Sequence, residues 1–176
     1  MRKIRHIIVH HSLSPWGDGE VIKSWHCSPK PQGNGWDNPG YHVVICNAYP
    51  NYSSWSSRRR LPPPTTADGR VDRILPEDRI SNGCKYANAD ALQVCLIGDL
   101  DKQPPTGKQR EALINLLALW CKGYGLDPYK AVFGHGEMQQ KIGREKYIKT
   151  CPGKTVDMEN IRGCVAATLK ESVTSY

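Results

Sequence analysis

The fold is decided by residues 91–97, which read ALQVCLI and are followed by Gly98 and Asp99. The length of this run and its branched apolar residues predict a buried β-strand. Residues 93–97 read as apolar on both faces, a pattern that is typical of a strand with both faces covered. We therefore expect residues 93–97 at the centre of a β-sheet that is flanked by helices.

The hydrophobic pattern on either side of this run predicts the other elements. Further strands are expected at residues 4–9, 41–46, 70–75 and 131–133. Helices are expected at residues 19–26, 107–122 and 157–172. Thr106 and Gln109 have the spacing of a capping box at the start of the second helix. With 176 residues and no visible repeat, the prediction is a single α/β domain over residues 1–176, with a central mixed β-sheet.

Residues 47–67 differ from the rest of the chain because they are polar, aromatic and rich in proline. Three consecutive prolines at 62–64 exclude a helix and a central strand at that point. A loop of this length inside a compact domain is usually functional or disordered. We expect an inserted Pro/Arg-rich loop, mobile or bound to a partner, in which Trp55 and residues 58–60 (RRR) contact glycan, nucleic acid or a protein. A solvated basic loop is the alternative.

The charge balance is 24 Lys and Arg against 17 Asp and Glu, a net charge of +7. Such a surface suggests a polyanionic partner (nucleic acid, anionic lipid or a cell-wall polymer), although surplus lysine alone gives the same balance.

No apolar run approaches the ~20 residues of a membrane span. Ile7-Ile8-Val9 is also shorter than the ~7–15 apolar residues of a secretory signal, so cytoplasmic synthesis without a signal peptide is expected. The seven cysteines contain no CxxC pair, which favours reduced thiols.

Candidate metal ligands follow the predicted strands. His10 comes directly after residues 4–9, His135 comes shortly after residues 131–133, and Cys151 follows further along. Two imidazoles and one thiolate form a zinc ligand set, and a catalytic zinc site keeps its fourth position for water. Six His and seven Cys allow many such triples by chance, so the spacing alone also fits an arrangement without metal.

A series of short motifs carries a resemblance to a known family. The motifs are His10-His11-Ser12, Ser24-Trp25-His26, Gly35-Trp36, Gly40-Tyr41-His42, Asp68-Gly69-Arg70-Val71, Val94-Cys95-Leu96-Ile97-Gly98, Gly134-His135-Gly136-Glu137 and Lys149-Thr150-Cys151-Pro152-Gly153. In this order, the set resembles the zinc-dependent N-acetylmuramoyl-L-alanine amidases of type 2, which include phage lysozyme-amidases and peptidoglycan recognition proteins. The resemblance runs from about residue 4 to residue 163.

The resemblance implies a role for individual residues. It assigns the Zn²⁺ ligands to His10, His135 and Cys151, with His11 as a neighbouring or surface histidine. It also implies that Tyr41 and Lys149 are catalytic. A lysine ammonium can stabilise the oxyanion of amide hydrolysis, and a phenol can orient the attacking water or help to move its proton.

Two segments depart from the family pattern. Residues 82–85 read NGCK where the family commonly has a His-Ala pair, and residues 90–93 read DALQ where it commonly has Asn-Ser-Ile-Gly. Both segments are expected to border the substrate groove. We therefore expect these changes to affect peptide specificity more than the metal site.

The resemblance implies an enzyme that hydrolyses the amide bond between N-acetylmuramic acid and L-alanine in peptidoglycan. With no signal peptide and no wall-binding module visible, a phage or prophage endolysin is expected, a monomer that reaches the cell wall after release. One alternative is a non-catalytic peptidoglycan-binding module. Another is a bifunctional amidase that also binds a phage RNA polymerase, with the 47–67 loop as a surface for a protein partner.

Overall fold

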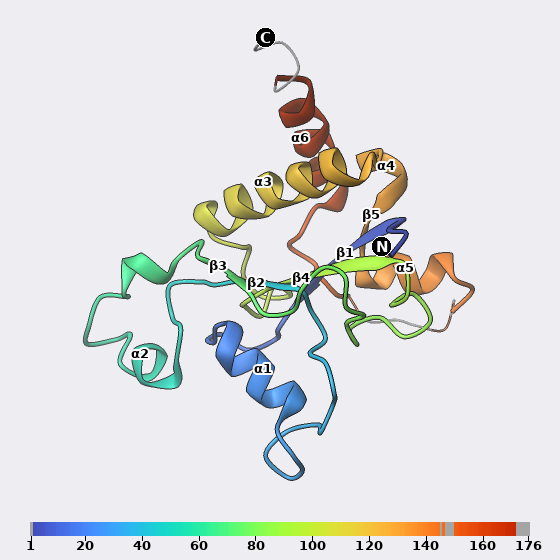
Figure 1. The fold of residues 1–176 in the computed structure, drawn as a ribbon. Helices are drawn as coiled ribbons and strands as arrows, with labels where there is room; N and C mark the ends of the chain where they lie inside the picture. Colours follow the sequence, from blue (N-terminus) through green and yellow to red (C-terminus); the bar gives the residue numbers. More distant parts are fainter. Residues whose placement is uncertain (1, 145, 147–149, 172–176) are drawn as a thin grey trace.

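Strand β4 (Ala91–Leu96) lies at the centre of a five-stranded sheet in the computed structural model (Figure 1). The structure describes residues 2–144, 146 and 150–171. The strand order is β3-β2-β4-β1-β5. The other strands are β1 (His6–His11), β2 (Val43–Ile45), β3 (Val71–Arg73) and β5 (Val132–Gly134). All neighbours are parallel except β2 and β3, so the predicted mixed sheet and central strand are confirmed.

Helices cover both faces of this sheet (Figure 1). Helices α3 (Gly107–Tyr124) and α6 (Met158–Glu171) pack on one face. Helices α1 (Gly19–Cys27) and α5 (His135–Lys141) pack on the other. A short helix, α4 (Pro128–Ala131), leads into β5. Within the part of the chain that the structure describes, no helix is long and apolar enough to cross a membrane.

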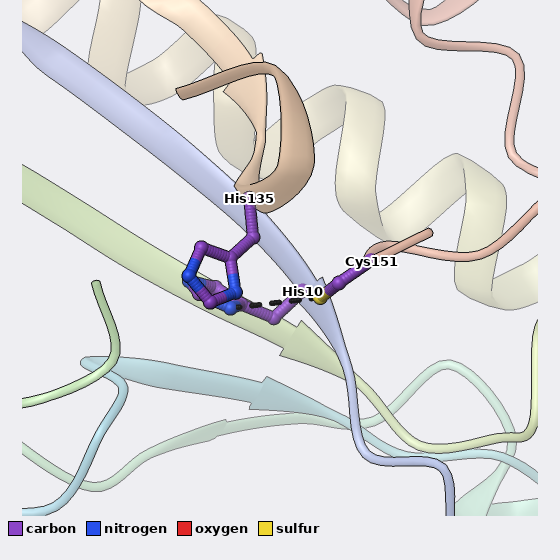
Figure 2. A group of neighbouring side chains, drawn as sticks. All are labelled: His10, His135 and Cys151. Atoms are coloured by element: carbon purple, nitrogen blue, oxygen red, sulfur yellow. Dashed lines mark hydrogen bonds between the residues drawn. The ribbon is translucent and has the colours of Figure 1, made fainter. Parts of the chain in front are cut away.

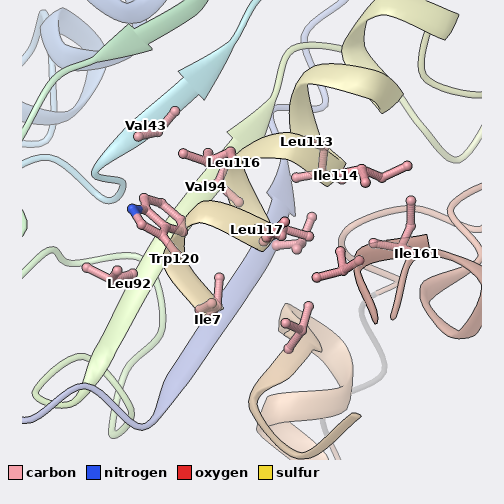
Figure 3. Packing of buried hydrophobic residues seen from close by; sticks show 14 of the residues in the cluster. Ile7, Val43, Leu92, Val94, Leu113, Ile114, Leu116, Leu117, Trp120 and Ile161 are labelled. Carbon is pink, nitrogen blue, oxygen red and sulfur yellow. The ribbon is translucent and has the colours of Figure 1, made fainter. Parts of the chain in front are cut away.

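The two faces of β4 differ in chemistry. Leu92, Val94 and Leu96 belong to the main apolar core, which they share with residues of α3 and α6. Figure 3 shows Leu92 and Val94 on the side of the sheet that α3 covers. Cys95 packs on the opposite face, and the buried amide of Gln93 lies on that face as well. The expectation that residues 93–97 are apolar on both faces is therefore wrong at Gln93. A buried amide has to be hydrogen-bonded, so its partners become informative.

Helix α3 begins at the predicted residue, with the predicted capping box, and ends two residues later than predicted, at Tyr124. Thr106 Oγ1 accepts a hydrogen bond from the Gln109 amide at 3.0 Å, and Gln109 Oε1 accepts one from the Thr106 amide at 3.1 Å. Gly125 ends the helix in the left-handed region at φ 63°, a conformation that glycine adopts without steric cost. Gln109 is buried, and its Nε2 donates to the carbonyls of Ile45 and Ile97. This second buried glutamine ties α3 to the ends of β2 and β4.

The 47–67 insertion leaves and re-enters the β2–β3 hairpin at one place. The Cys46 amide donates to Arg70 O at 2.9 Å, and the Gly69 amide donates to Cys46 O at 2.9 Å. Between these points the chain forms helix α2 (Tyr52–Ser56), capped by Asn51, and a turn of 3₁₀ helix at Thr65–Ala67. Neither element was predicted from the sequence.

Removal of the insertion should leave the fold intact. Because the hairpin is already closed at Cys46 and Gly69, a variant that joins Cys46 to Asp68 through a short turn should fold and bind zinc. Thermal unfolding and metal analysis measure both properties. The insertion contacts the body through the Tyr49 carbonyl, which accepts from the Gly17 amide at 2.9 Å. Loss of folding in the shortened variant would mean that such contacts make the insertion part of the core.

Candidate metal centre

His10, His135 and Cys151 come together on the face of the sheet that α1 and α5 cover. One possible ligand atom from each residue lies within 4.8 Å of the others. Cys151 Sγ is 3.8 Å from His10 Nδ1, and the two imidazole centroids are 4.6 Å apart. Figure 2 shows the three side chains converging from β1, from the start of α5 and from the segment before α6.

His10 is held in one orientation. It is 1% exposed, and its Nε2 lies 2.8 Å from the side-chain oxygen of Gln93. When Nε2–H donates to that oxygen, Nδ1 keeps its lone pair on the side of Cys151. Burial lowers the pKa of His10 well below its ordinary value, and the neighbouring His135 lowers it further. The imidazole is therefore neutral, which is the form that binds metal.

The strand–helix junction positions His135. Strand β5 ends at Gly134, and α5 begins at His135 without a side-chain cap. Glu137 Oε2 accepts from the Gly134 amide at 2.8 Å, and Arg162 holds the same carboxylate at 2.9 Å. This ion pair fixes the turn between β5 and α5, from which the His135 side chain projects.

The segment that carries Cys151 is anchored by Asp101. Thr150 Oγ1 donates to the two carboxylate oxygens of Asp101 at 2.6 and 2.8 Å, and the Lys154 amide donates to one of them at 3.0 Å. The Gly136 amide donates to Cys151 O at 2.8 Å, so the segment is also tied to the start of α5. These contacts hold the thiol beside the two imidazoles.

A cavity of about 420 Å³ opens onto these groups. Its lining includes His10, His11, Tyr41, Asp101, His135 and Cys151. The Tyr41 ring lies 4.9 Å from the His10 ring, and the His26 ring packs against Tyr41 at 5.3 Å. His11 is 6% exposed, and its Nδ1 accepts from the Leu100 amide at 3.1 Å. Lys149, the other predicted catalytic residue, lies outside the described residues.

A second cavity of about 460 Å³ adjoins the first, and Leu13 lines both. The 47–67 insertion supplies part of its wall, including Tyr49, Trp55 and Arg58. The Arg58 guanidinium lies 4.0 Å from the centre of the Trp55 ring. The insertion therefore reaches the neighbourhood of the candidate site.

Sequence reasoning did not connect Gln93 or Asp101 with this site. Gln93 lies in a segment whose departure from the family pattern was expected to affect peptide specificity more than the metal site. The structure instead places its amide in contact with His10. A polar residue inside an otherwise apolar strand was the available signal, because a buried amide needs partners. Asp101 gives no comparable signal, since its role depends on a segment 49 residues away.

Buried His42 makes stability depend on pH. Its Nδ1 accepts a hydrogen bond from the backbone N–H of Gln93 at 3.0 Å, and its Nε2 lies 3.0 Å from the carbonyl oxygen of Arg79. Burial lowers the pKa of His42 to about 4. The pKa of this histidine in the unfolded chain is ~6.5. At pH values between about 4 and ~6.5, the unfolded chain therefore binds a proton at His42 that the folded chain does not bind. Stability should therefore fall by roughly 3 kcal/mol as pH drops through this window. Urea unfolding with chelator present measures the slope.

His42→Gln is the comparison for this prediction. Glutamine retains a donor and an acceptor but does not titrate in this range. Other buried histidines also contribute to the wild-type slope, so the difference between the two proteins isolates His42. An equal pH dependence in both would contradict the prediction.

Comparison with known proteins gives one family and one fold. The family model for N-acetylmuramoyl-L-alanine amidase matches residues 1–154. No curated protein sequence matches the chain significantly.

Three solved structures illustrate the likeness in fold. The amidase LysC from Clostridium intestinale URNW is 21% identical, with a TM-score of 0.69 over 94% of this chain and 87% of that chain. The Ph2119 endolysin from a Thermus scotoductus bacteriophage is 23% identical, with a TM-score of 0.64 over 94% of this chain and 86% of that chain. Drosophila PGRP-LB is 18% identical, with a TM-score of 0.62 over 100% of this chain and 82% of that chain. At these identities the structures establish the fold.

Proposed function

The chain belongs to the N-acetylmuramoyl-L-alanine amidase family, and we propose that it hydrolyses the amide bond between N-acetylmuramic acid and L-alanine in peptidoglycan. The observation that carries the proposal is the convergence of His10, His135 and Cys151 at the wall of one open cavity. An anionic envelope would also attract a protein with a net charge of +7.

The three side chains suit zinc in chemistry and in placement. Two neutral imidazoles and a thiolate are common zinc ligands, and catalytic sites use three protein ligands. Their donor atoms lie within 4.8 Å of one another, close enough to share one ion after small side-chain adjustments. When bound, Zn²⁺ would polarise the scissile carbonyl and lower the pKa of water at the site toward ~7.

We assign the remaining chemistry to Tyr41 and Lys149. The Tyr41 ring borders the same cavity beside His10. We assign its hydroxyl the role of orienting the attacking water or helping to move its proton. The Lys149 ammonium would stabilise the negative charge that develops on the carbonyl oxygen. That assignment rests on the motif Lys149-Thr150-Cys151.

A phage or prophage endolysin is the biological role that we propose, made in the cytoplasm and acting on the cell wall after release. The fold shared with the Ph2119 endolysin supports this role. PGRP-LB also shares the fold, so a peptidoglycan-binding module without turnover is the alternative. The complete set of candidate ligands, including Cys151, favours the enzyme.

Mass spectrometry of digested peptidoglycan tests the proposal. Purified wall fragments are incubated with the protein, with and without a zinc chelator. We expect intact stem peptides and free muramic-acid glycan, no new reducing sugar ends, and no products with chelator. New reducing ends would indicate a glycosidase, and the absence of all products with zinc supplied would contradict the amidase proposal.

A further inference from the structure

We propose that Gln93 is a positioning residue that holds His10 in the tautomer required of a zinc ligand. The inference rests on the zinc site proposed above. Gln93 is fully buried, and its side-chain oxygen lies 2.8 Å from His10 Nε2. The amide group thus contacts the imidazole on the side opposite to the nitrogen that faces Cys151.

A chain of hydrogen bonds determines which atom of each side-chain amide is the donor and which is the acceptor. It begins at the Cys84 backbone amide, which can only donate, and which lies 2.8 Å from the side-chain oxygen of Asn88. That oxygen also accepts from Gln93 Nε2 at 2.8 Å, and Ser81 Oγ accepts from the same nitrogen at 3.0 Å. With both of its N–H groups used in this way, Gln93 must present its oxygen to His10.

The tautomer of His10 follows from this arrangement. An amide oxygen is only an acceptor, so Nε2 of His10 has to carry the proton. Nδ1 is then the nitrogen with the free lone pair, and it is the one 3.8 Å from Cys151 Sγ. Partners of this kind fix the ring orientation and raise the basicity of metal-binding histidines.

Gly83 provides the space that Gln93 needs. A Cβ atom at Gly83 would overlap Gln93 Oε1 and the carbonyl oxygen of Gly40, so a larger residue cannot be placed there without displacing the amide. Gly83 and Gln93 belong to the segments 82–85 and 90–93, the two that depart from the family pattern. The two segments that depart from the family pattern therefore contact each other next to His10.

Zinc affinity of Gln93→Met tests the role directly. Methionine has a similar length and remains apolar, but it offers no comparable acceptor to His10. We expect a roughly 10–100-fold weaker affinity, measured by competition with a chromophoric chelator. Gln93→Glu retains an oxygen acceptor and should recover part of the loss.

Gln109→Met is the matched control. Gln109 is also a buried glutamine with three hydrogen bonds, but its partners are Ile45, Ile97 and Thr106. Its replacement should lower stability and leave zinc affinity unchanged. Equal zinc affinity in folded Gln93→Met and wild type would overturn the proposal, as would equal losses in both methionine variants.

Two measurements remain decisive if Gln93→Met does not fold. Nitrogen-15 NMR of the zinc-free wild type at pH 8 should show His10 protonated at Nε2, and protonation at Nδ1 would overturn the proposal. Gly83→Ala should weaken zinc binding although Gln93 is still present, and unchanged affinity in this folded variant would also contradict it. Failure of the wild type to bind zinc would instead refute the proposed metal site, which separates the two outcomes.

Discussion

Replacement of Cys151 by serine should remove tight zinc binding and stop amide hydrolysis with it. A serine hydroxyl is neutral at pH 7, whereas a cysteine thiolate is a strong zinc ligand. His10 and His135 would remain, one ligand fewer than a catalytic zinc site normally has. We expect the affinity to fall well beyond the roughly 10–100-fold effect of losing a hydrogen-bond partner of a ligand. Metal analysis after dialysis measures the loss.

The segment around residue 151 should keep its shape in this variant. Its anchor is the carboxylate of Asp101, which accepts from Thr150 and Lys154. Cys27→Ser is the control, because Cys27 is also a partly buried cysteine but lies at the end of α1. The control should bind zinc as the wild type does. Full zinc occupancy in Cys151→Ser would contradict the assignment of this thiol as a ligand.

The parts of the fold that could be predicted are those with a strong local signal. Strand β4 is nearly continuous in apolar residues, and α3 carries its own capping box and terminal glycine. Helix α5 has no side-chain cap at its start, and it depends on the burial of Met138 and on the ion pair between Glu137 and Arg162. Such tertiary support is not visible in a window of sequence.

The same distinction applies to the candidate site. His10 and His135 could be predicted as candidate ligands because each lies at the C-terminal end of a strand, His10 near the end of β1 and His135 directly after β5, and within a short motif. The orientation of Gln93 depends on its hydrogen bond to Asn88 and on the space left by Gly83, and both residues belong to an irregular segment with no periodic pattern. Its orientation depends on hydrogen bonds that only the folded chain brings together. Candidate metal ligands are thus easier to predict from sequence than the residues proposed to orient them.

Tyr41→Phe and Lys149→Ala should each reduce turnover while the metal content stays unchanged. Neither residue belongs to the proposed ligand set of His10, His135 and Cys151. Proton transfer and electrostatic stabilisation are each worth roughly 10²–10⁴ in rate, so losses of this size are expected in a wall-lysis assay. Tyr129→Phe and Lys130→Ala on α4 are matched controls, because both side chains are exposed and lie outside the cavity lining.

Binding to peptidoglycan separates the enzyme from a recognition module. Affinity for the ground state does not require groups that act in the transition state, so both variants should still bind walls. A pull-down with insoluble peptidoglycan measures this binding alongside turnover. Lysis at the wild-type rate by both variants would contradict the proposed roles of Tyr41 and Lys149. A wild type that binds walls and holds zinc but releases no stem peptide would favour the recognition module, because the same cavity would then bind without hydrolysis.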